Sequence, residues 1–207
     1  MCTSRWIVPP TLEGRLVRLE PLTENHVDGL QAAVRDGELW KLWYTPIPPP
    51  EEMSAFVAAN RNQPRDPDLT AFAVLDRSGR VLGTTRYLNV DRANRRLEIG
   101  GTWYAQSAQR TGVNTECKLL LLTHAFEVLN CIAVEFRTHW INLASRNAIT
   151  RLGAKQDGVL RQHRILPDGT LRDTVVFSIV NSEWPTIKNH LHALRSSRSE
   201  GGRVAPA

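Results

Sequence analysis

Residues 109–114 read Gln109-Arg110-Thr111-Gly112-Val113-Asn114, and they stand between a strand-like segment and a long apolar one. A glycine at the start of a helix lets the backbone approach a ligand, and the free N–H groups of the first helical turn point at it. Those N–H groups together act as roughly half a positive charge, so a pyrophosphate is a suitable guest. A glycine before a helix is more often plain turn geometry, and the order of the surrounding elements is what favours phosphate binding here.

The two common phosphate loops are absent around this turn. No Gly-Lys-Ser/Thr follows it, which argues against a P-loop nucleotidase, and no Gly-x-Gly-x-x-Gly occurs, which argues against a dinucleotide-binding fold. Residues 96–104 alternate as a strand, residues 113–129 are too long and too apolar for anything but a buried helix, and residues 132–138 alternate again. The turn therefore opens the helix of a strand-helix-strand unit.

The rest of the chain alternates between short strands and capped helices. Strands are predicted at 11–20, 70–75, 81–90, 154–164 and 171–180, and helices at 23–35, 51–60, 142–152 and 182–194. In the fourth helix of the chain, Asn142 is the expected cap and the inward stripe is Ser145, Ala148, Ile149 and Leu152. This order predicts an α+β fold with a mixed, mostly antiparallel central sheet of about seven strands, flanked by about five helices.

The overall composition fits one globular domain. The chain has 207 residues, of which 42% are hydrophobic and 23% charged. We expect residues 1–195 to form a single domain and residues 196–207 to be a disordered tail. No uninterrupted apolar run is long enough for a membrane span, and the first residues leave no room for a signal peptide, so a cytoplasmic protein without membrane contact is expected.

The net charge and the cysteines exclude few classes of function. The net charge of +5 suits a solvated surface or an anionic ligand, but basic residues never run beyond two in a row and no nucleic-acid-binding motif occurs, so no nucleic-acid partner is expected. The three cysteines have no metal-like spacing, and no metal is expected. Cys117 and Cys131 are interpreted as small buried hydrophobes, with a catalytic thiol at Cys117 as the less favoured alternative.

At these motifs the chain resembles the GCN5-related N-acetyltransferases (the GNAT family), from about Leu12 to Leu194. The family's acyl-CoA loop, Gln/Arg-x-x-Gly-x-Gly/Ala, is matched by Gln109 and Gly112, whereas Asn114 replaces a small residue. The stretches 112–118, 142–154 and 166–173 resemble the branch that contains the ribosomal-protein alanine acetyltransferases, although Ala154 stands where the family usually has an aromatic residue.

The resemblance implies a GNAT fold in which the fourth and fifth strands splay apart, with acetyl-CoA as co-substrate. The strand ending near Tyr104 and the strand beginning at Cys131 would form the V-shaped gap that receives the pantetheine arm. Candidate cofactor-binding residues are Gln109, Arg110, Thr111, Gly112, Val113 and Asn114 in the turn, Thr102, Trp103 and Tyr104 chiefly through their main chain, and Asn142, which could serve both as a helix cap and as a contact to the arm.

The resemblance also implies direct attack of a primary amine on the thioester. Ser145 is the candidate acid for the departing thiolate, with a plain buried serine as the alternative. Glu98 is the first candidate for the base, although an ion pair with Arg86 or Arg96 is equally compatible with its position; Glu135 and His163 are further candidates. Positioning is expected to carry most of the rate, so no single base need be essential.

The acceptor is left open by the sequence. The aromatic residues Trp40, Trp43 and Tyr44 are candidates for its binding site or for the core, and the arginines at 161, 164 and 172 could meet an acidic acceptor. A protein N-terminus and a small-molecule amine are both compatible, as is a homodimer. The alternative function is a non-catalytic acyl-CoA-binding module.

Overall fold

A single eight-stranded sheet organises the chain, with neighbouring strands in the order β1-β2-β3-β4-β5-β6-β8-β7. The computed structural model describes residues 6–61 and 68–200. Its strands are β1 Leu12–Glu13, β2 Val17–Pro21, β3 Thr70–Asp76, β4 Val81–Asp91, β5 Arg96–Tyr104, β6 Ala133–His139, β7 Lys155–Ile165 and β8 Leu171–Val180. All neighbours are antiparallel except β5 and β6, so the predicted mixed, mostly antiparallel sheet is confirmed.

One strand more than the expected seven is present, because the strand predicted at 11–20 is divided. β1 turns back on β2, and the turn between them is closed by a hydrogen bond from the Gly14 N–H to the Val17 carbonyl. The buried carboxylate of Glu116 accepts hydrogen bonds from the backbone N–H groups of Leu16 and Val17. A side chain about a hundred residues away in the sequence therefore fixes where the strand breaks.

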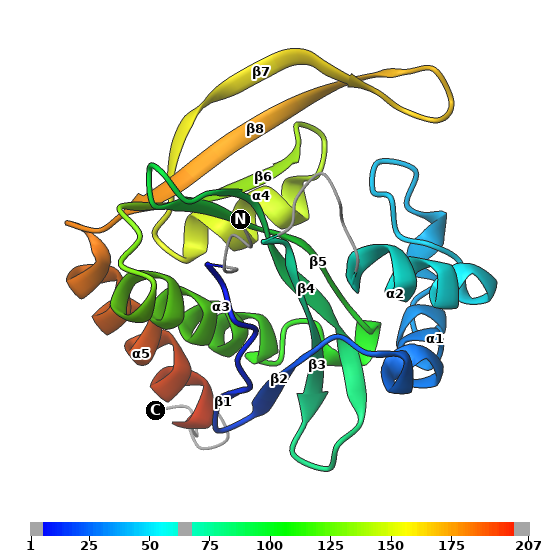
Figure 1. Cartoon of the computed structure of the whole chain (residues 1–207), viewed down its shortest axis with the longest axis horizontal. Coiled ribbons are helices and arrows are strands. Elements are labelled where there is room, and N and C mark those ends of the chain that lie inside the picture. Colours follow the sequence, from blue (N-terminus) through cyan, green and yellow to red (C-terminus); the bar gives the residue numbers. More distant parts are fainter. Residues whose placement is uncertain (1–5, 62–67, 201–207) are drawn as a thin grey trace, which may run out of the picture.

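Five α-helices flank the sheet: α1 Val27–Arg35, α2 Met53–Arg61, α3 Val113–Thr123, α4 Leu143–Arg151 and α5 Trp184–Glu200. Short 3-10 turns, at Glu24–His26 and Pro50–Glu52, precede α1 and α2, and a π-helical turn, His124–Val128, follows α3. In Figure 1, α1 and α2 lie on one side of the sheet and α3 and α5 on the other. None of the helices within the described residues is long and apolar enough to cross a membrane.

The last helix is longer than predicted. It runs to Glu200 rather than ending near Leu194, so residues 196–200 of the expected disordered tail continue the helix. Residues 201–207 lie outside the described part of the chain. Leu191, which is fully buried, anchors this helix in the core, and α5 packs on α3.

The parallel pairing between β5 and β6 is short, and the gap that opens where it ends is the place of the candidate site. Only three register pairs join them, from Arg96↔Ala133 to Glu98↔Glu135, although both strands continue beyond. After Glu98 the two strands diverge, β5 toward Tyr104 and β6 toward His139 (Figure 1). The predicted splay between the strands that flank the long helix is thus confirmed.

Candidate functional site

At the start of α3, Gly112 provides no side-chain cap, and the Val113 N–H makes only a long hydrogen bond, 3.5 Å, to the Thr111 hydroxyl of the turn. Gly112 is the residue before the helix, and its φ of 108° lies in the left-handed region, where a side chain would be strained. The Thr111 hydroxyl donates 2.6 Å to the Ala108 carbonyl, which shapes the turn from within. Val113 is buried and anchors the start of the helix. These features suit a pyrophosphate held by backbone N–H groups.

Two side chains of the turn are directed at the end of β5. The Gln109 amide donates 3.1 Å to the Tyr104 carbonyl, so it fastens the turn to the strand. The Tyr104 hydroxyl donates 3.3 Å to the Asn114 side-chain oxygen. The larger residue that replaces the family's glycine or alanine therefore has a structural partner of its own.

Beyond Glu98, β5 presents backbone toward the gap while its side chains are engaged elsewhere. Its conformation changes at Gly101, whose φ of 56° is also left-handed. Thr102 exchanges a 2.8 Å hydrogen bond with Thr85 of β4 and accepts a 2.7 Å bond from the ammonium group of Lys118. Trp103 is buried, and its ring N–H has no hydrogen-bond partner among the described residues. The arrangement suits recognition of a pantetheine arm through main-chain groups.

The start of α4 lies at the other side of the gap, after β6. The Asn142 side chain accepts a 3.0 Å hydrogen bond from the Ser145 backbone N–H, so the predicted cap is present. Ser145 is half-buried one turn into the helix, and Ile149 and Leu152 of the same stripe are buried. The structure brings Asn142 and Ser145 together at one helix end.

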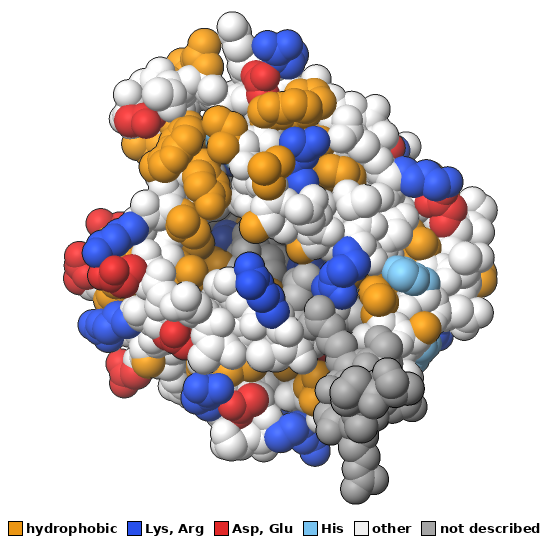
Figure 2. All heavy atoms as spheres, turned by 180° about the vertical axis from the view of Figure 1, so that it is seen from behind, with side chains coloured by type: hydrophobic (Ala, Val, Ile, Leu, Met, Phe, Trp, Pro, Cys, Tyr) orange, Lys and Arg blue, Asp and Glu red, His pale blue; other side chains and the backbone are white. Residues whose placement is uncertain are grey.

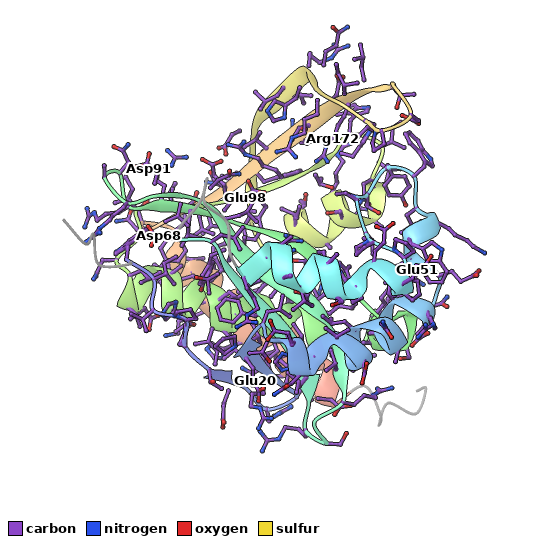
Figure 3. All side chains as sticks on the ribbon, turned by 45° about the vertical axis from the view of Figure 1, so that its right-hand side comes forward. Glu20, Glu51, Asp68, Asp91, Glu98 and Arg172 are labelled. Atoms are coloured by element: carbon purple, nitrogen blue, oxygen red, sulfur yellow. The ribbon has the colours of Figure 1, made fainter. Side chains whose placement is uncertain are left out.

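Glu98 occupies the last paired position before the splay. It is 6% exposed, accepts a 2.7 Å hydrogen bond from the Asn89 amide and lies 3.5 Å from the Arg137 guanidinium. Burial is the main reason why its pKa is raised above the ordinary value. Its ion-pair partner is Arg137, not Arg86 or Arg96 as the sequence suggested. Figure 3 shows Glu98 on β5 and Arg172 on β8.

The other two candidate bases have different surroundings. Glu135 accepts hydrogen bonds from Arg96 (2.6 Å) and Arg137 (2.8 Å). Burial alone would raise its pKa, but these guanidinium groups lower it below the ordinary value. His163 shares a 3.1 Å hydrogen bond with the Thr174 hydroxyl, and burial followed by nearby arginines lowers its pKa. Glu98 is the carboxylate most disposed to take a proton.

The aromatic loop contributes two rings to the site. Trp43 and Tyr44 both stand edge-on to the ring of His139, with centroid distances of 5.7 and 6.4 Å. Trp40 packs instead against the hydrophobic core. His139, at the end of β6, was not singled out in the sequence; its place three residues before the predicted cap Asn142 was the available signal.

Helix α3 contributes two further buried side chains, Cys117 and Lys118. Burial raises the pKa of the Cys117 thiol to about 12, so it is not a thiolate near neutral pH, in keeping with its interpretation as a buried hydrophobe. Lys118 lies beside it and was not predicted as a site residue. No cluster of metal-ligating side chains occurs among residues 6–61 and 68–200.

Comparisons with known proteins agree with this arrangement. The family model described as "Acetyltransferase (GNAT) domain" matches residues 16–155. A Bacillus subtilis (strain 168) protein named "Putative ribosomal N-acetyltransferase YdaF" is 31% identical over 106 residues, which span 51% of this chain and only 57% of that relative.

Solved structures share the fold over most of the chain. A GCN5-related N-acetyltransferase from Brucella melitensis has a TM-score of 0.80 and 33% identity, over 90% of this chain and 86% of that one. Mycobacterium smegmatis RimJ, solved in complex with CoA-disulfide, has a TM-score of 0.75 and 22% identity, over 90% and 95% of the two chains.

Proposed function

The chain belongs to the GNAT family of acyl-CoA-dependent N-acetyltransferases, and from this premise we propose that it transfers an acetyl group from acetyl-CoA to a primary amine bound at the splay of β5 and β6. The observation that carries the proposal is the divergence of these strands after Glu98, with an uncapped helix start at one side and the Asn142–Ser145 helix cap at the other.

The residues present fit a bound acyl-CoA. The pyrophosphate would lie on the N–H groups that follow Gly112, because Gly112 provides no side-chain cap and the Val113 N–H makes only a 3.5 Å hydrogen bond to Thr111. The pantetheine arm would pair with the backbone of β5 from Ile99 to Tyr104, which is not hydrogen-bonded to β6 in the described pairing. The thioester would then lie between this strand and the start of α4, and the co-substrate supplies the acetyl group.

The transfer requires that the amine nitrogen bonds to the thioester carbonyl carbon while the carbon–sulfur bond breaks. Glu98 would take the proton that the amine loses, since burial raises the pKa of this carboxyl. Ser145 would give a proton to the departing thiolate from the first turn of α4, and its hydroxyl would regain a proton from solvent, while Glu98 would release the amine proton to solvent. Both roles depend on positioning of the two substrates, which carries a large part of the rate in such direct transfers.

An acceptor larger than a simple amine is favoured by exposed hydrophobic side chains on the segments that follow β6. From behind, hydrophobic side chains gather on the upper part of the molecule (Figure 2). The exposed large hydrophobic residues include Trp140, Ile141 and Leu143 before and within α4, and Leu160, Ile165 and Leu171 on the β7–β8 hairpin. A peptide could cover such a surface, which agrees with the ribosomal acceptor in the name of the B. subtilis relative.

The first test is release of CoA thiol from acetyl-CoA in the presence of alkylamines, amino-acid amides and short peptides with free N-termini. Stimulated release by at least one class is expected. Binding of acetyl-CoA without release in any acceptor class would favour the alternative, a non-catalytic acyl-CoA-binding module.

Two variants test the assigned places. Gly112→Trp should abolish acetyl-CoA binding, because the new side chain strains the left-handed position and fills the space next to the helix N–H groups. Ser145→Ala should lower kcat while acetyl-CoA affinity stays near wild type. Undiminished binding in the first variant would mean that the cofactor lies elsewhere, and wild-type turnover in the second would remove Ser145 from the mechanism.

A further inference from the structure

His139 is a buried polar side chain with one unpartnered nitrogen at the acceptor side of the site. The residue is 5% exposed and ends β6, on the strand that diverges from β5. Its Nε2 has no hydrogen-bond partner among the described residues. Buried polar groups are nearly always partnered, so an orphaned ring nitrogen beside a substrate site calls for an explanation.

The tautomer of His139 follows from its local contact. Its Nδ1 lies 3.1 Å from the backbone nitrogen of Ile141, and a backbone N–H can only donate. Nδ1 must therefore carry the lone pair, and in the neutral ring the proton is on Nε2. A protonated Nδ1 could not accept this bond, so the ring is neutral; burial, followed by the nearby Arg172, lowers the pKa of this histidine against the opposing effect of Asp173. His139 thus presents a hydrogen-bond donor and not a base.

The position of His139 connects the donor with the reacting groups. Along β6 the polar residues Glu135, Arg137 and His139 alternate with the buried Val134, Phe136 and Thr138, so they share the face of the strand on which Glu98 meets Arg137. The carbonyl of His139 accepts a 2.9 Å hydrogen bond from the Asn142 N–H, which joins it to the cap of α4.

The aromatic loop covers the same ring. Trp43 and Tyr44 stand edge-on to His139, and Trp43 is itself 55% exposed. Through Trp43, His139 therefore lies one aromatic ring away from the exposed surface.

We propose that the Nε2–H group of His139 donates a hydrogen bond to an oxygen atom of the acceptor, and thereby selects amines that carry a carbonyl oxygen on the carbon next to the amine-bearing one. This assignment rests on the proposed acetyl transfer and adds a residue that chooses among amines. An amine without such an oxygen would gain no hydrogen bond from this N–H group, so it would bind less tightly than an amine that carries the oxygen.

Two substitutions distinguish the loss of the Nε2–H donor from a disturbance of the local fold. His139→Asn places an amide oxygen near the position of Nδ1, so the bond from the Ile141 N–H can persist while nothing replaces Nε2. His139→Gln is longer and can bring an amide N–H near the position of Nε2. Asparagine should therefore remove the donor, and glutamine should restore it in part.

The experiment measures kcat/KM with two acceptors, alaninamide and 3-methylbutan-2-amine, in which an isopropyl group takes the place of the carboxamide. For alaninamide, His139→Asn should lower kcat/KM about tenfold or more, mainly through KM, and His139→Gln should recover most of the loss. For 3-methylbutan-2-amine, all three proteins should have similar values. Each acceptor is compared only between proteins, so the different basicity of the two amines cancels.

The outcomes distinguish a failure of the proposed acetyl transfer from a failure of the role assigned to His139. If wild-type protein transfers acetyl groups to neither acceptor, nor to any other amine tested, the proposed function fails. If wild-type protein is active but His139→Asn affects the two acceptors equally, or leaves both unchanged, the role of His139 is refuted. Circular dichroism and the acetyl-CoA affinity of each variant identify a loss of fold. If His139→Asn is misfolded, the comparison of His139→Gln with a third variant, His139→Ser, tests the proposal instead.

Discussion

Replacing Lys118 by methionine should make the protein more stable at neutral pH. The Lys118 side chain is 5% exposed, and its ammonium group donates to the Thr102 hydroxyl at 2.7 Å and to the Thr85 hydroxyl at 3.3 Å. Among the described ion pairs, none joins Lys118 to a carboxylate. Burial lowers the pKa of this lysine from 10.5 to about 8.

The sign of the effect follows from the direction of that pKa change. A folded-state pKa below the unfolded one means that the unfolded chain holds the proton more tightly. The charged lysine therefore opposes folding; the cost is fully present below about pH 8 and disappears as the pH rises toward 10.5. Each pKa unit corresponds to about 1.4 kcal/mol, so the largest cost is about 3 kcal/mol.

Methionine has a similar length and no charge, and the two threonine hydroxyls remain 2.8 Å apart and can bond to each other. Allowing for the lost lysine hydrogen bonds, we expect Lys118→Met to be about 1–3 kcal/mol more stable at pH 7. The advantage should shrink steadily between pH 8 and pH 10. Taking the difference between the two proteins cancels the titration of all other groups.

Urea unfolding at several pH values, followed by circular dichroism, measures this difference. A variant that is less stable than wild type at pH 7, by an amount independent of pH, would contradict this expectation. It would mean that the ammonium group is well solvated or paired. Acetyl-CoA affinity should be measured in parallel, because Thr102 belongs to the strand at the gap. A variant that is more stable but binds acetyl-CoA more weakly would show that the charge of Lys118 supports cofactor binding.

Three further changes test the contacts that hold the site in place. Glu116→Ala should destabilise the protein by about 3–5 kcal/mol in urea unfolding, since it leaves the Val17 N–H and the guanidinium of Arg195 without their buried partner. Asn142→Ala should cost about 1 kcal/mol by the same measurement, whereas Asn142→Asp should retain the cap and most of the stability. Gly153→Ala should lower the melting temperature in calorimetry by an amount equivalent to about 1–2 kcal/mol, because its φ of 94° is left-handed and the added methyl would meet a side chain of α5; an unchanged melting temperature would contradict this.

Local sequence signals were sufficient for most of the fold. The bounds of β5 and β8 agree with the strands predicted at 96–104 and 171–180, because alternation with period two is written into each segment. The cap at Asn142 and the helix start after Gly112 were likewise visible, since both depend on residues within one turn. The break between β1 and β2 was not, because Glu116 determines it through tertiary contact.

The candidate site, like the fold, could be predicted from the sequence where it depends on local patterns. The positions of the turn and of the α4 cap follow from local patterns, and their common placement at the splay follows from the family resemblance. His139 and Lys118 could not be identified, because burial and the lack of a partner arise only when distant elements pack. The choice between Glu98 and Glu135 also needed the structure, since both are single carboxylates within alternating strands.

That choice leads to a prediction about pH, because Glu98 and Glu135 are register partners and both lie near Arg137. The negative charge of Glu135 raises the pKa of Glu98, as burial does more strongly. Glu135→Gln removes that charge and frees Arg137 for Glu98, and both changes lower the pKa of Glu98. The acidic limb of the kcat profile should therefore move to lower pH, while Glu98→Gln should lower kcat and abolish the limb. A limb that stays in place in Glu135→Gln, or moves to higher pH, would mean that the proton is taken by a group other than Glu98.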